Sequence, residues 1–367
     1  MKIAIMAPLV TAIREPQRGG SQVFVCDLAR GLAGRGHDVH VYAASGSEIA
    51  GVEVIDTGID PRSLSGTFYR AFEQSAGEPG QAESAAAAAA AAAESAFTTA
   101  YALMARSRYD VIHNHAFDAP AVRLATALPA PVLHTLHLPP DTAVAAALRE
   151  VVAGSRPPAV ATVTQFQASA WRRVVHLDAI LPPYPPTAVI PWSTMPGRGA
   201  LFAGRLSPEK GTAEAIDIAR LAEVPIDVYG DVYDPDYSRD QIDPRRGWPM
   251  VSMHPGVPRA TLWEAMARAA VVLFPARWDE PFGLVAAEAQ ACGTPVIAFR
   301  RGGLDEVIVD GVTGLLVPPD DVRTAAEAVS KVAAMSRAAC RKHAEGQLDL
   351  ELSLDAHERL YRRLSGG

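Results

Sequence analysis

The stretch VVLFPARWDEPFGLVAAEAQACGTPVIAF, residues 271–299, contains one complete strand, loop, helix and strand pattern. Residues 271–276 are apolar and predict a buried strand, and residues 277–283 predict the loop after it. Residues 284–292 predict a helix, which a second apolar strand at 295–299 follows. Segments in this order form a right-handed βαβ unit with parallel strands. The stretch therefore predicts a parallel sheet covered by helices.

The same alternation runs through both halves of the chain. In the first half, helical patterns at 21–36 and 80–106 alternate with strand-like runs at 2–7, 38–44, 52–58, 110–115 and 131–137. In the second half, the helix above and another at 211–222 alternate with strand-like runs at 200–206, 225–231, 271–276 and 295–299. A Pro-rich stretch at 181–199 separates the two series. The expected fold class is α/β, with two Rossmann-like domains joined near residues 192–199.

The helix at 21–36 has recognisable ends. Ser21 is a residue type that caps helix amino termini, so we expect it to begin the helix. Gly34 and Gly36 stand where the helix is expected to end before the next strand.

Composition excludes several classes of partner. A net charge of -7 and a pI near 5.8 argue against a broad nucleic-acid or membrane surface, because either partner favours clustered Lys and Arg. Cys26, Cys292 and Cys340 are odd in number and far apart, which indicates free thiols in a reducing cytosol. The run MKIAIMAPLV has neither the length of a signal h-region nor a small-residue cleavage site, so we expect it to form the first strand. No stretch approaches the roughly 20 apolar residues that span a bilayer. We therefore expect a cytoplasmic protein without nucleic-acid partners or stable membrane association.

The loop at 277–283 predicts an anion site. Ligands of open α/β sheets bind outside the carboxyl ends of the strands, and a helix amino terminus offers free N–H groups to an anion. A phosphate would fit at Gly283 and Leu284, because glycine permits close backbone approach. Glu280 and Glu288 could accept hydrogen bonds from hydroxyls on either side of that phosphate. A phosphate between two polyols is the chemistry of a nucleotide sugar.

Two other interpretations of the carboxylate pair remain open on these residues alone. Paired acids also carry out glycoside hydrolysis, although a loop and helix setting disfavours it. Acids near a helix amino terminus can also be solvated residues that compensate the helix dipole.

The stretch LFAGRLSPEKG, residues 201–211, adds two cations. Arg205 and Lys210 follow a strand and are expected at the same carboxyl edge as the loop at 277–283. There they could neutralise a diphosphate and stabilise its charge as it leaves. Alone this pattern describes many surface loops, and the nearby carboxylates favour the functional interpretation.

Three segments together resemble glycosyltransferase family 4, the retaining enzymes that use nucleotide sugars. They are GGS at 19–21, GRLSPEKG at 204–211, and EPFGLVAAEAQACGTPVIAFRRGGLDEVIVDGVTGLLV at 280–317. The resemblance implies the GT-B architecture, in which two Rossmann-like domains face across a cleft. Gln22 departs from the pattern, since many members carry Glu after the glycine pair.

The resemblance implies a role for each matching residue. Arg205 and Lys210 would bind the diphosphate, Glu280 the donor sugar and Glu288 the nucleotide ribose. His115 would contact the donor sugar from the first domain, while Thr135 and His137 would line the acceptor side. The catalytic set is therefore His115, Arg205, Lys210 and Glu280. The remaining donor-binding positions are Gly19, Gly20, Gly204, Val257, Phe282, Gly283, Leu284, Val285 and Glu288.

The histidines also permit a different class of function. A metal-dependent hydrolase using His113, His115, His134 and His137 is an alternative, although accompanying carboxylate ligands are not evident. For His113 and His134 we favour satisfied histidines at strand ends. Asp234 and Asp236 are interpreted as turn residues and not as a metal motif. A non-catalytic sugar-nucleotide binder is the remaining alternative.

The resemblance also suggests a reaction and an organisation for the chain. We expect a metal-independent, front-face transfer with retention from a UDP-sugar, or less favourably a GDP-sugar, to a soluble small-molecule or saccharide acceptor, with no cofactor. The expected domains are an acceptor domain at 1–192, a donor domain at 193–350 and a terminal helix at 351–367 that crosses back to the first domain. Loops at 9–19 and 58–80 are expected to shape the acceptor pocket.

Overall fold

A computed structural model describes residues 1–17, 19–64, 79–195 and 197–366, without the side chains of residues 79–86. The chain forms two compact units. The first is Met1–Pro182 with Ser353–Gly367, and the second is Pro183–Leu352. The division therefore falls at Pro182, while the sequence placed it at residue 192. The last residues belong to the first unit.

The first unit is built on a parallel sheet of seven strands in the order β3-β2-β1-β4-β5-β6-β7. Its register places Met6 of β1 beside Tyr42 of β2 and Asn114 of β4. Its strands are β1 (Lys2–Met6), β2 (Asp38–Ala43), β3 (Glu53–Asp56), β4 (Val111–Asn114), β5 (Val132–Leu136), β6 (Ala159–Thr162) and β7 (Ala179–Ile180).

The second unit repeats this plan with six parallel strands in the order β10-β9-β8-β11-β12-β13. They are β8 (Ala200–Ala203), β9 (Ile226–Tyr229), β10 (Val251–His254), β11 (Val271–Phe274), β12 (Val296–Phe299) and β13 (Gly314–Val317). In each sheet the strand order reverses between two central neighbours, β1 and β4 or β8 and β11. Ligands of doubly wound sheets bind at the carboxyl ends of such strands. The fold thus marks one candidate ligand edge in each unit.

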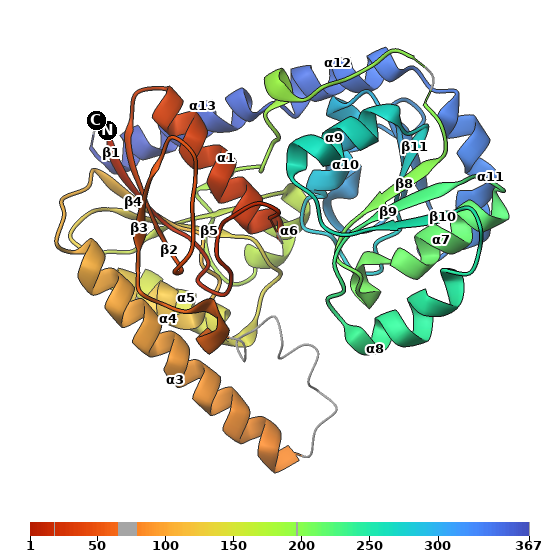
Figure 1. Ribbon diagram of the computed structural model, residues 1–367. Helices are drawn as coiled ribbons and strands as arrows, with labels where there is room; N and C mark the ends of the chain where they lie inside the picture. Colours follow the sequence, from red (N-terminus) through yellow and green to blue (C-terminus); the bar gives the residue numbers. More distant parts are fainter. Residues whose placement is uncertain (18, 65–78, 196, 367) are drawn as a thin grey trace. The chain divides into compact units, whose positions relative to one another are not determined.

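Helices cover both faces of the first sheet. Figure 1 shows α1 and α13 on one face and α3, α4 and α5 on the other. Gly31 of α1 lies so close to α13 that an added Cβ would be 2.7 Å from Leu354 Cδ1. The helices of this unit are α1 (Gly20–Gly34), α3 (Pro79–Met104), α4 (Ala119–Ala125), α5 (Thr142–Val152), α6 (Gln165–Trp171) and α13 (Leu350–Leu364), which begins in the second unit.

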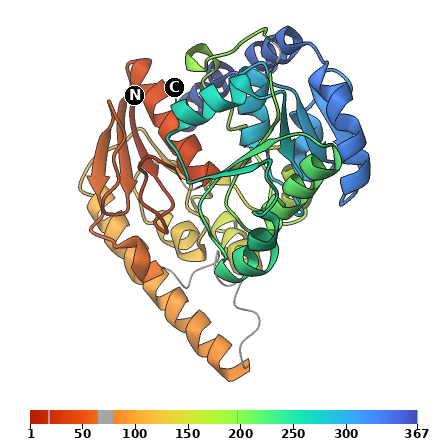
Figure 2. The same ribbon diagram turned by 45° about the vertical axis from the view of Figure 1, so that its right-hand side comes forward.

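The second sheet has α7 and α11 packed on one core face, where Ile216 and Val329 join Leu273. Figure 2 shows the helices of this unit from a second direction. They are α7 (Thr212–Leu221), α8 (Pro235–Tyr237), α9 (Arg259–Arg268), α10 (Leu284–Ala291), α11 (Val322–Ala333) and α12 (Arg337–Gln347). Short helical turns lie at Pro61–Leu64, Thr187–Val189, Pro208–Lys210, Ser238–Ile242, Asp243–Arg245 and Gly302–Glu306.

Every strand predicted from the sequence is present, while β6, β7, β10 and β13 were not predicted. The prediction that Ser21 caps α1 was wrong. Gly19 is the N-cap, and no side chain caps it. The Ser21 hydroxyl instead donates to Gln22 Oε1. Over the described parts of the chain, no helix has the length and apolar character needed to cross a bilayer.

Candidate active site

The predicted cation and acid of the second unit meet at the carboxyl edge of β8 and β11. Lys210 follows β8, and Glu280 lies in the loop after β11. Lys210 Nζ is 2.8 Å from Glu280 Oε2, which also accepts a hydrogen bond of 2.8 Å from Trp278 Nε1. Because β8 and β11 are neighbours, these loops converge although 70 residues separate the pair. The structure therefore brings together two residues that the sequence assigned to one site.

Arg205 occupies the same edge and also has an acidic partner. Its Nη2 donates to Glu209 Oε1 at 2.9 Å, and its guanidinium lies 4.3 Å from the centroid of the Tyr233 ring. Lys210 Nζ similarly lies 4.9 Å from the Trp278 ring centroid. Aromatic faces attract cations, so both rings help to hold these side chains in place. Gly204, which precedes Arg205, bonds through its N–H to Tyr229 O.

The amino terminus of α10 has the form of an anion site. Gly283 is the N-cap with φ +94°, and no side chain caps the helix. Helix termini without caps leave the first N–H groups available to an anion. A Cβ at Gly283 would lie 2.5 Å from Leu304 Cδ2, so both space and backbone conformation favour glycine. Phe282 is buried, whereas Leu284 and Val285 are half-buried at the start of the helix.

The segment Gly302–Glu306 contacts the backbone of the loop before α10. The Gly303 N–H donates to Glu280 O at 2.7 Å. A Cβ at Gly302 would lie 2.2 Å from that same oxygen, and Gly302 has φ +64°. This contact fixes the backbone that carries Glu280.

Glu288 is buried, with 3% of its surface exposed. Its Oε1 accepts hydrogen bonds from Arg259 Nη2 at 2.6 Å and from Trp263 Nε1 at 3.0 Å. Arg259 begins α9, two residues after the half-buried Val257. The carboxylate predicted to meet a ribose is therefore already engaged by two side chains of α9.

The first unit carries its candidate residues at the carboxyl edge of β4 and β5. His115 follows β4 and His137 follows β5, and their Nδ1 and Nε2 atoms are 2.9 Å apart. Phe24 of α1 makes edge contacts with both rings, at centroid distances of 5.4 and 5.8 Å. His115 Nε2 is buried and has no hydrogen-bond partner in the described structure. That nitrogen is available to a ligand.

Gly19 is the N-cap of α1 and Gly20 is its first residue, after the loop that follows β1. A Cβ at Gly19 would lie 2.4 Å from Gln22 Oε1. The Gln22 amide donates to Thr11 Oγ1 at 2.6 Å, which ties the helix start to the preceding loop.

Comparisons with known proteins identify the family. The model described as "Glycosyltransferase Family 4" matches residues 18–183, and the model described as "Glycosyl transferases group 1" matches residues 197–347. The chain belongs to glycosyltransferase family 4. The two matches lie on the two sheets.

The relatives of this glycosyltransferase carry the name D-inositol 3-phosphate glycosyltransferase. The protein of Xylanimonas cellulosilytica is 29% identical over 93% of this chain and 93% of its own length. That of Kineococcus radiotolerans is 29% identical over 89% of this chain and 86% of its own. The chain is thus an enzyme that transfers a glycosyl group.

Solved structures place the glycosyltransferase in the GT-B fold. Sucrose-phosphate synthase from Thermosynechococcus elongatus has a TM-score of 0.77 at 20% identity, with 99% of each chain covered. Anabaena HepE in complex with UDP-glucose has a TM-score of 0.71 at 19% identity, covering 99% of this chain and 100% of HepE.

The histidines of the glycosyltransferase do not form a metal-ligand set. Both ring nitrogens of His113 are in hydrogen bonds, to Tyr361 Oη at 2.6 Å and to Thr135 Oγ1 at 2.7 Å. His134 Nδ1 contacts the amide of Asn114. Within the ranges that the structure describes, no group of three or more His, Cys, Asp or Glu side chains could hold a metal ion. The hydrolase alternative therefore has no ligand cluster in those ranges.

Two predictions about polar residues have clear outcomes. His113 is satisfied, but His134 is only half satisfied, since its buried Nε2 has no described partner. Both lie inside strands and not at strand ends. Asp234 is a turn residue as predicted, because it caps α8 by accepting from the Tyr237 N–H. Asp236 forms an ion pair with Arg239.

Burial determines the charge state of the histidine cluster. It lowers the pKa of His115 well below its usual value, and the neighbouring His137 and His357 lower it further. Burial also lowers the pKa of His137 to about 4. Both rings are therefore neutral near pH 7, so His115 can offer Nε2 as a donor or an acceptor but not as a cation.

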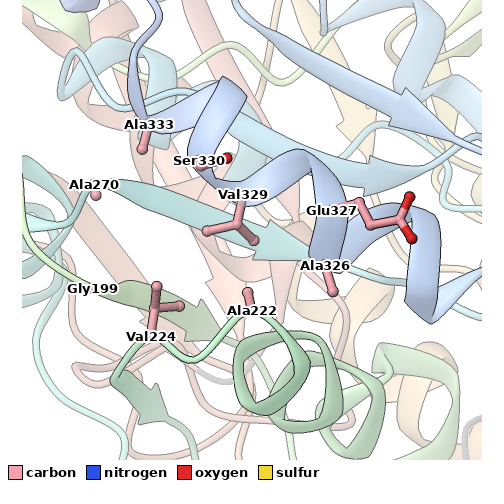
Figure 3. A pocket seen from close by; sticks show the side chains of 9 residues that line it. All are labelled: Gly199, Ala222, Val224, Ala270, Ala326, Glu327, Val329, Ser330 and Ala333. Atoms are coloured by element: carbon pink, nitrogen blue, oxygen red, sulfur yellow. The ribbon is translucent and has the colours of Figure 1, made fainter.

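A separate hollow of about 250 Å³ lies at the opposite edge of the second sheet (Figure 3). Gly199 and Ala270 line it immediately before β8 and β11. Its other lining residues are Ala222, Val224, Ala326, Glu327, Val329, Ser330 and Ala333. The predicted site residues lie at the carboxyl ends of the same strands, so this hollow is not part of the site.

Several site residues were missed by the sequence reasoning. Arg259 and Trp263 are four positions apart on α9, which places them on one helical face. That spacing was a usable signal. Glu209 and Trp278 offered no comparable pattern, because their importance comes from contacts across the edge of the sheet.

Proposed function

We propose that this glycosyltransferase takes its sugar from a nucleoside diphosphate sugar, with UDP favoured as the nucleotide. The observation that carries the proposal is the Lys210–Glu280 pair at the carboxyl edge of β8 and β11. Beside it, Arg205 adds a second cation and the uncapped α10 adds free N–H groups. A diphosphate matches the cations and the N–H groups. The solved complexes of Anabaena HepE with UDP and UDP-glucose support the choice of nucleotide.

In the proposed reaction, the protein stabilises the leaving group. The bond between the anomeric carbon and the diphosphate oxygen breaks, and negative charge grows on the diphosphate. Lys210 and Arg205 would stabilise that charge. Glu280 holds the Lys210 ammonium at 2.8 Å in the free protein, and it would accept hydrogen bonds from the sugar hydroxyls.

We further propose that transfer proceeds with retention on the front face of the sugar. The acceptor oxygen forms its bond to the anomeric carbon on the face from which the diphosphate departs. The acceptor hydroxyl proton passes to an oxygen of the departing diphosphate. His115 would offer its unpartnered Nε2 to a hydroxyl of the donor sugar. Because the cations and the helix terminus would meet the diphosphate charge, this scheme requires no metal ion.

A titration of UDP into the protein tests the donor proposal. Calorimetry is expected to show binding to the wild type and weaker binding to Lys210→Met. Lys331→Met is the control, because Lys331 is an exposed lysine on α11 of the same unit. Absence of UDP and GDP binding at millimolar concentration would refute the proposal.

The product tests the rest of the scheme. NMR of the product linkage should show the anomeric configuration of the donor, and an inverted anomer would contradict front-face transfer. EDTA should leave the rate unchanged. A rate lost in EDTA and restored by a divalent cation would contradict the metal-independent scheme.

For the acceptor we propose a soluble polyol, with D-inositol 3-phosphate as the first probe because the relatives carry that name. Residues 58–95 contain two Arg against five acidic residues, which would repel anionic lipid. The predicted acceptor loop at 58–80 lies partly outside the described residues. A cytoplasmic location belongs to this proposal and is supported by three buried free cysteines. Binding to anionic liposomes at physiological salt would contradict the soluble acceptor.

A further inference from the structure

A buried chain of hydrogen bonds connects the terminal helix α13 with strand β5. Tyr361 Oη lies 2.6 Å from His113 Nδ1, and His113 Nε2 lies 2.7 Å from Thr135 Oγ1. At most 2% of any of these three residues is exposed. This chain of hydrogen bonds therefore ends at Thr135, a residue predicted to line the acceptor side.

The three groups of this chain are uncharged. Burial lowers the pKa of His113 well below its usual value and raises the pKa of Tyr361 well above its own. A neutral imidazole carries one N–H, so one ring nitrogen donates and the other accepts. The chain can therefore run in two directions. In each direction, the proton of one of the two hydroxyl groups has no acceptor within the hydrogen-bond chain.

In the first direction, Tyr361 donates to His113 Nδ1, and His113 Nε2–H donates to Thr135. The Thr135 proton is then free for another acceptor. In the second direction, Thr135 donates to His113 Nε2, and the Tyr361 proton is left without a partner. The other described contacts of the Tyr361 side chain are between rings, with His113 and His357. A buried hydroxyl proton without a partner carries its full desolvation penalty, which disfavours the second direction.

A small cavity borders Thr135. Thr135 lines a small cavity of about 20 Å³ together with His137, Leu138 and Trp171. That volume holds one water molecule or one hydroxyl of a ligand. The first direction thus leaves the free proton on a residue that borders this cavity, whereas the second leaves it on Tyr361, which does not border it.

We propose that Tyr361 is a positioning residue, which fixes the His113 proton on Nε2 and makes Thr135 a hydrogen-bond donor to an oxygen of the acceptor. The acceptor part rests on the proposed function. The tautomer of His113 does not, because it follows from the contacts of the free protein. The terminal helix thereby controls which hydrogen-bond partner the site selects.

The tautomer of His113 is measured in protein labelled with 15N-histidine, by long-range 1H–15N correlation without substrate. The His113 signals are assigned by their loss in His113→Gln. The wild type is expected to carry the proton on Nε2. In Tyr361→Phe a population with the proton on Nδ1 should appear. A wild-type proton on Nδ1, or a His113 spectrum that Tyr361→Phe leaves unchanged, would overturn the proposal.

Tyr42→Phe is the matched control. Its hydroxyl is also buried, and it bonds to Tyr109 Oη at 2.7 Å, away from the residues of the site. This variant removes a buried tyrosine hydroxyl and should leave the His113 signals in place. A shift of those signals equal to the shift in Tyr361→Phe would indicate a general loss of packing and would overturn the assignment.

Transfer from UDP-glucose to D-inositol 3-phosphate gives a second readout. Thr135→Val and Tyr361→Phe should each raise KM for the acceptor roughly tenfold, the effect of one lost neutral hydrogen bond. Thr135→Ser keeps the hydroxyl and should raise KM less than Thr135→Val does. An acceptor KM unchanged in Tyr361→Phe would overturn the positioning role. No transfer by the wild type would contradict the acceptor class in "Proposed function", and the tautomer measurement would still decide the role of Tyr361.

Discussion

Glu280 and Glu288 belong to one short segment, yet their environments differ. The Glu280 side chain is 12% exposed and contacts Lys210 and Trp278 at the edge of the sheet. The Glu288 side chain is 4% exposed and lies against Arg259. A carboxylate at the edge can exchange a protein partner for a ligand with little desolvation, whereas a buried one cannot. Glu280 is therefore the more accessible of the two carboxylates, and Glu288 connects α10 with Arg259 of α9.

Lys210 provides the sharpest test of the edge position. Lys210→Ala should remove about 2 to 4 kcal/mol of transition-state stabilisation, the effect of one lost charge-stabilising group. Steady-state turnover with UDP-glucose measures the loss. Lys210→Arg keeps the charge and should retain more activity than Lys210→Ala. Turnover equal to the wild type in both variants would show that Lys210 does not act on the leaving group.

Breaking the buried ion pair between Arg259 and Glu288 should lower the stability of the protein without changing the charges at the sheet edge. Arg259→Met leaves the Glu288 carboxylate buried without its cation, which should cost about 3 kcal/mol of unfolding free energy. Urea denaturation measures this cost. Arg300→Met is the control, because Arg300 pairs with Asp305 and Asp310 while 43% of its side chain is exposed. The control should lose less than about 1 kcal/mol, and equal losses would contradict the argument.

At the scale of elements, the position of the loop before α10 depends on the turn Gly302–Glu306. Gly302 has φ +64°, and its missing Cβ leaves room for the backbone of Glu280. Gly311 has a similar φ of +79°, but a Cβ there would meet nothing within 4 Å. The two glycines share the conformational requirement and differ in the space around them.

Alanine substitutions at the two glycines therefore distinguish the cost of the backbone conformation from the cost of a steric contact. Gly311→Ala should cost about 1 to 2 kcal/mol of stability, the penalty of a left-handed conformation. Gly302→Ala should cost more and should also weaken UDP binding, because the added carbon displaces the loop that carries Glu280. Urea denaturation and calorimetry measure the two effects. UDP affinity that falls equally in both variants would contradict a specific role for Gly302.

The sequence predicted most of the described strands from their apolar runs, but it missed the short apolar strands β6 and β13 as well as β7 and β10. β7 has two residues and β10 is a short edge strand with exposed Ser252, so neither shows a clear period. Ser21 was predicted as a cap from its residue type, but α1 begins at Gly20 and its N-cap is Gly19. Capping depends on the exact first turn, which composition alone does not determine.

Contacts between distant segments were harder to predict than the elements. Lys210 and Glu280 could be placed at one edge because the strand order of an open sheet is predictable. The pairing of Arg259 with Glu288 depends on how α9 packs against α10, 29 residues along the chain. The contact of Tyr361 with His113 spans 248 residues. Such contacts follow from the packing of whole helices, which no local pattern in the sequence contains.

At the scale of the whole molecule, the first unit concentrates buried neutral histidines, whereas the edge of the second concentrates charged pairs. Burial lowers the pKa of His134, His137 and His357 to about 4. It lowers the pKa of His113 and His115 well below the usual value. In the unfolded chain these groups have a pKa of about 6.5, so between about pH 6.5 and 4 the unfolded chain binds more protons than the folded one.

The free energy of unfolding should therefore fall as the pH falls from about 6.5 to 5, by up to about 1.4 kcal/mol per pH unit for each histidine. Asp118 opposes this trend, because burial raises its pKa to about 6 and the folded state then binds its proton first. Urea denaturation at several pH values gives the slope. His357→Gln should reduce it by about one proton, while His176→Gln, at an exposed position of the same unit, should leave it unchanged. A slope that His357→Gln does not alter would mean that His357 accepts its proton equally well in the folded protein, against the burial that surrounds it.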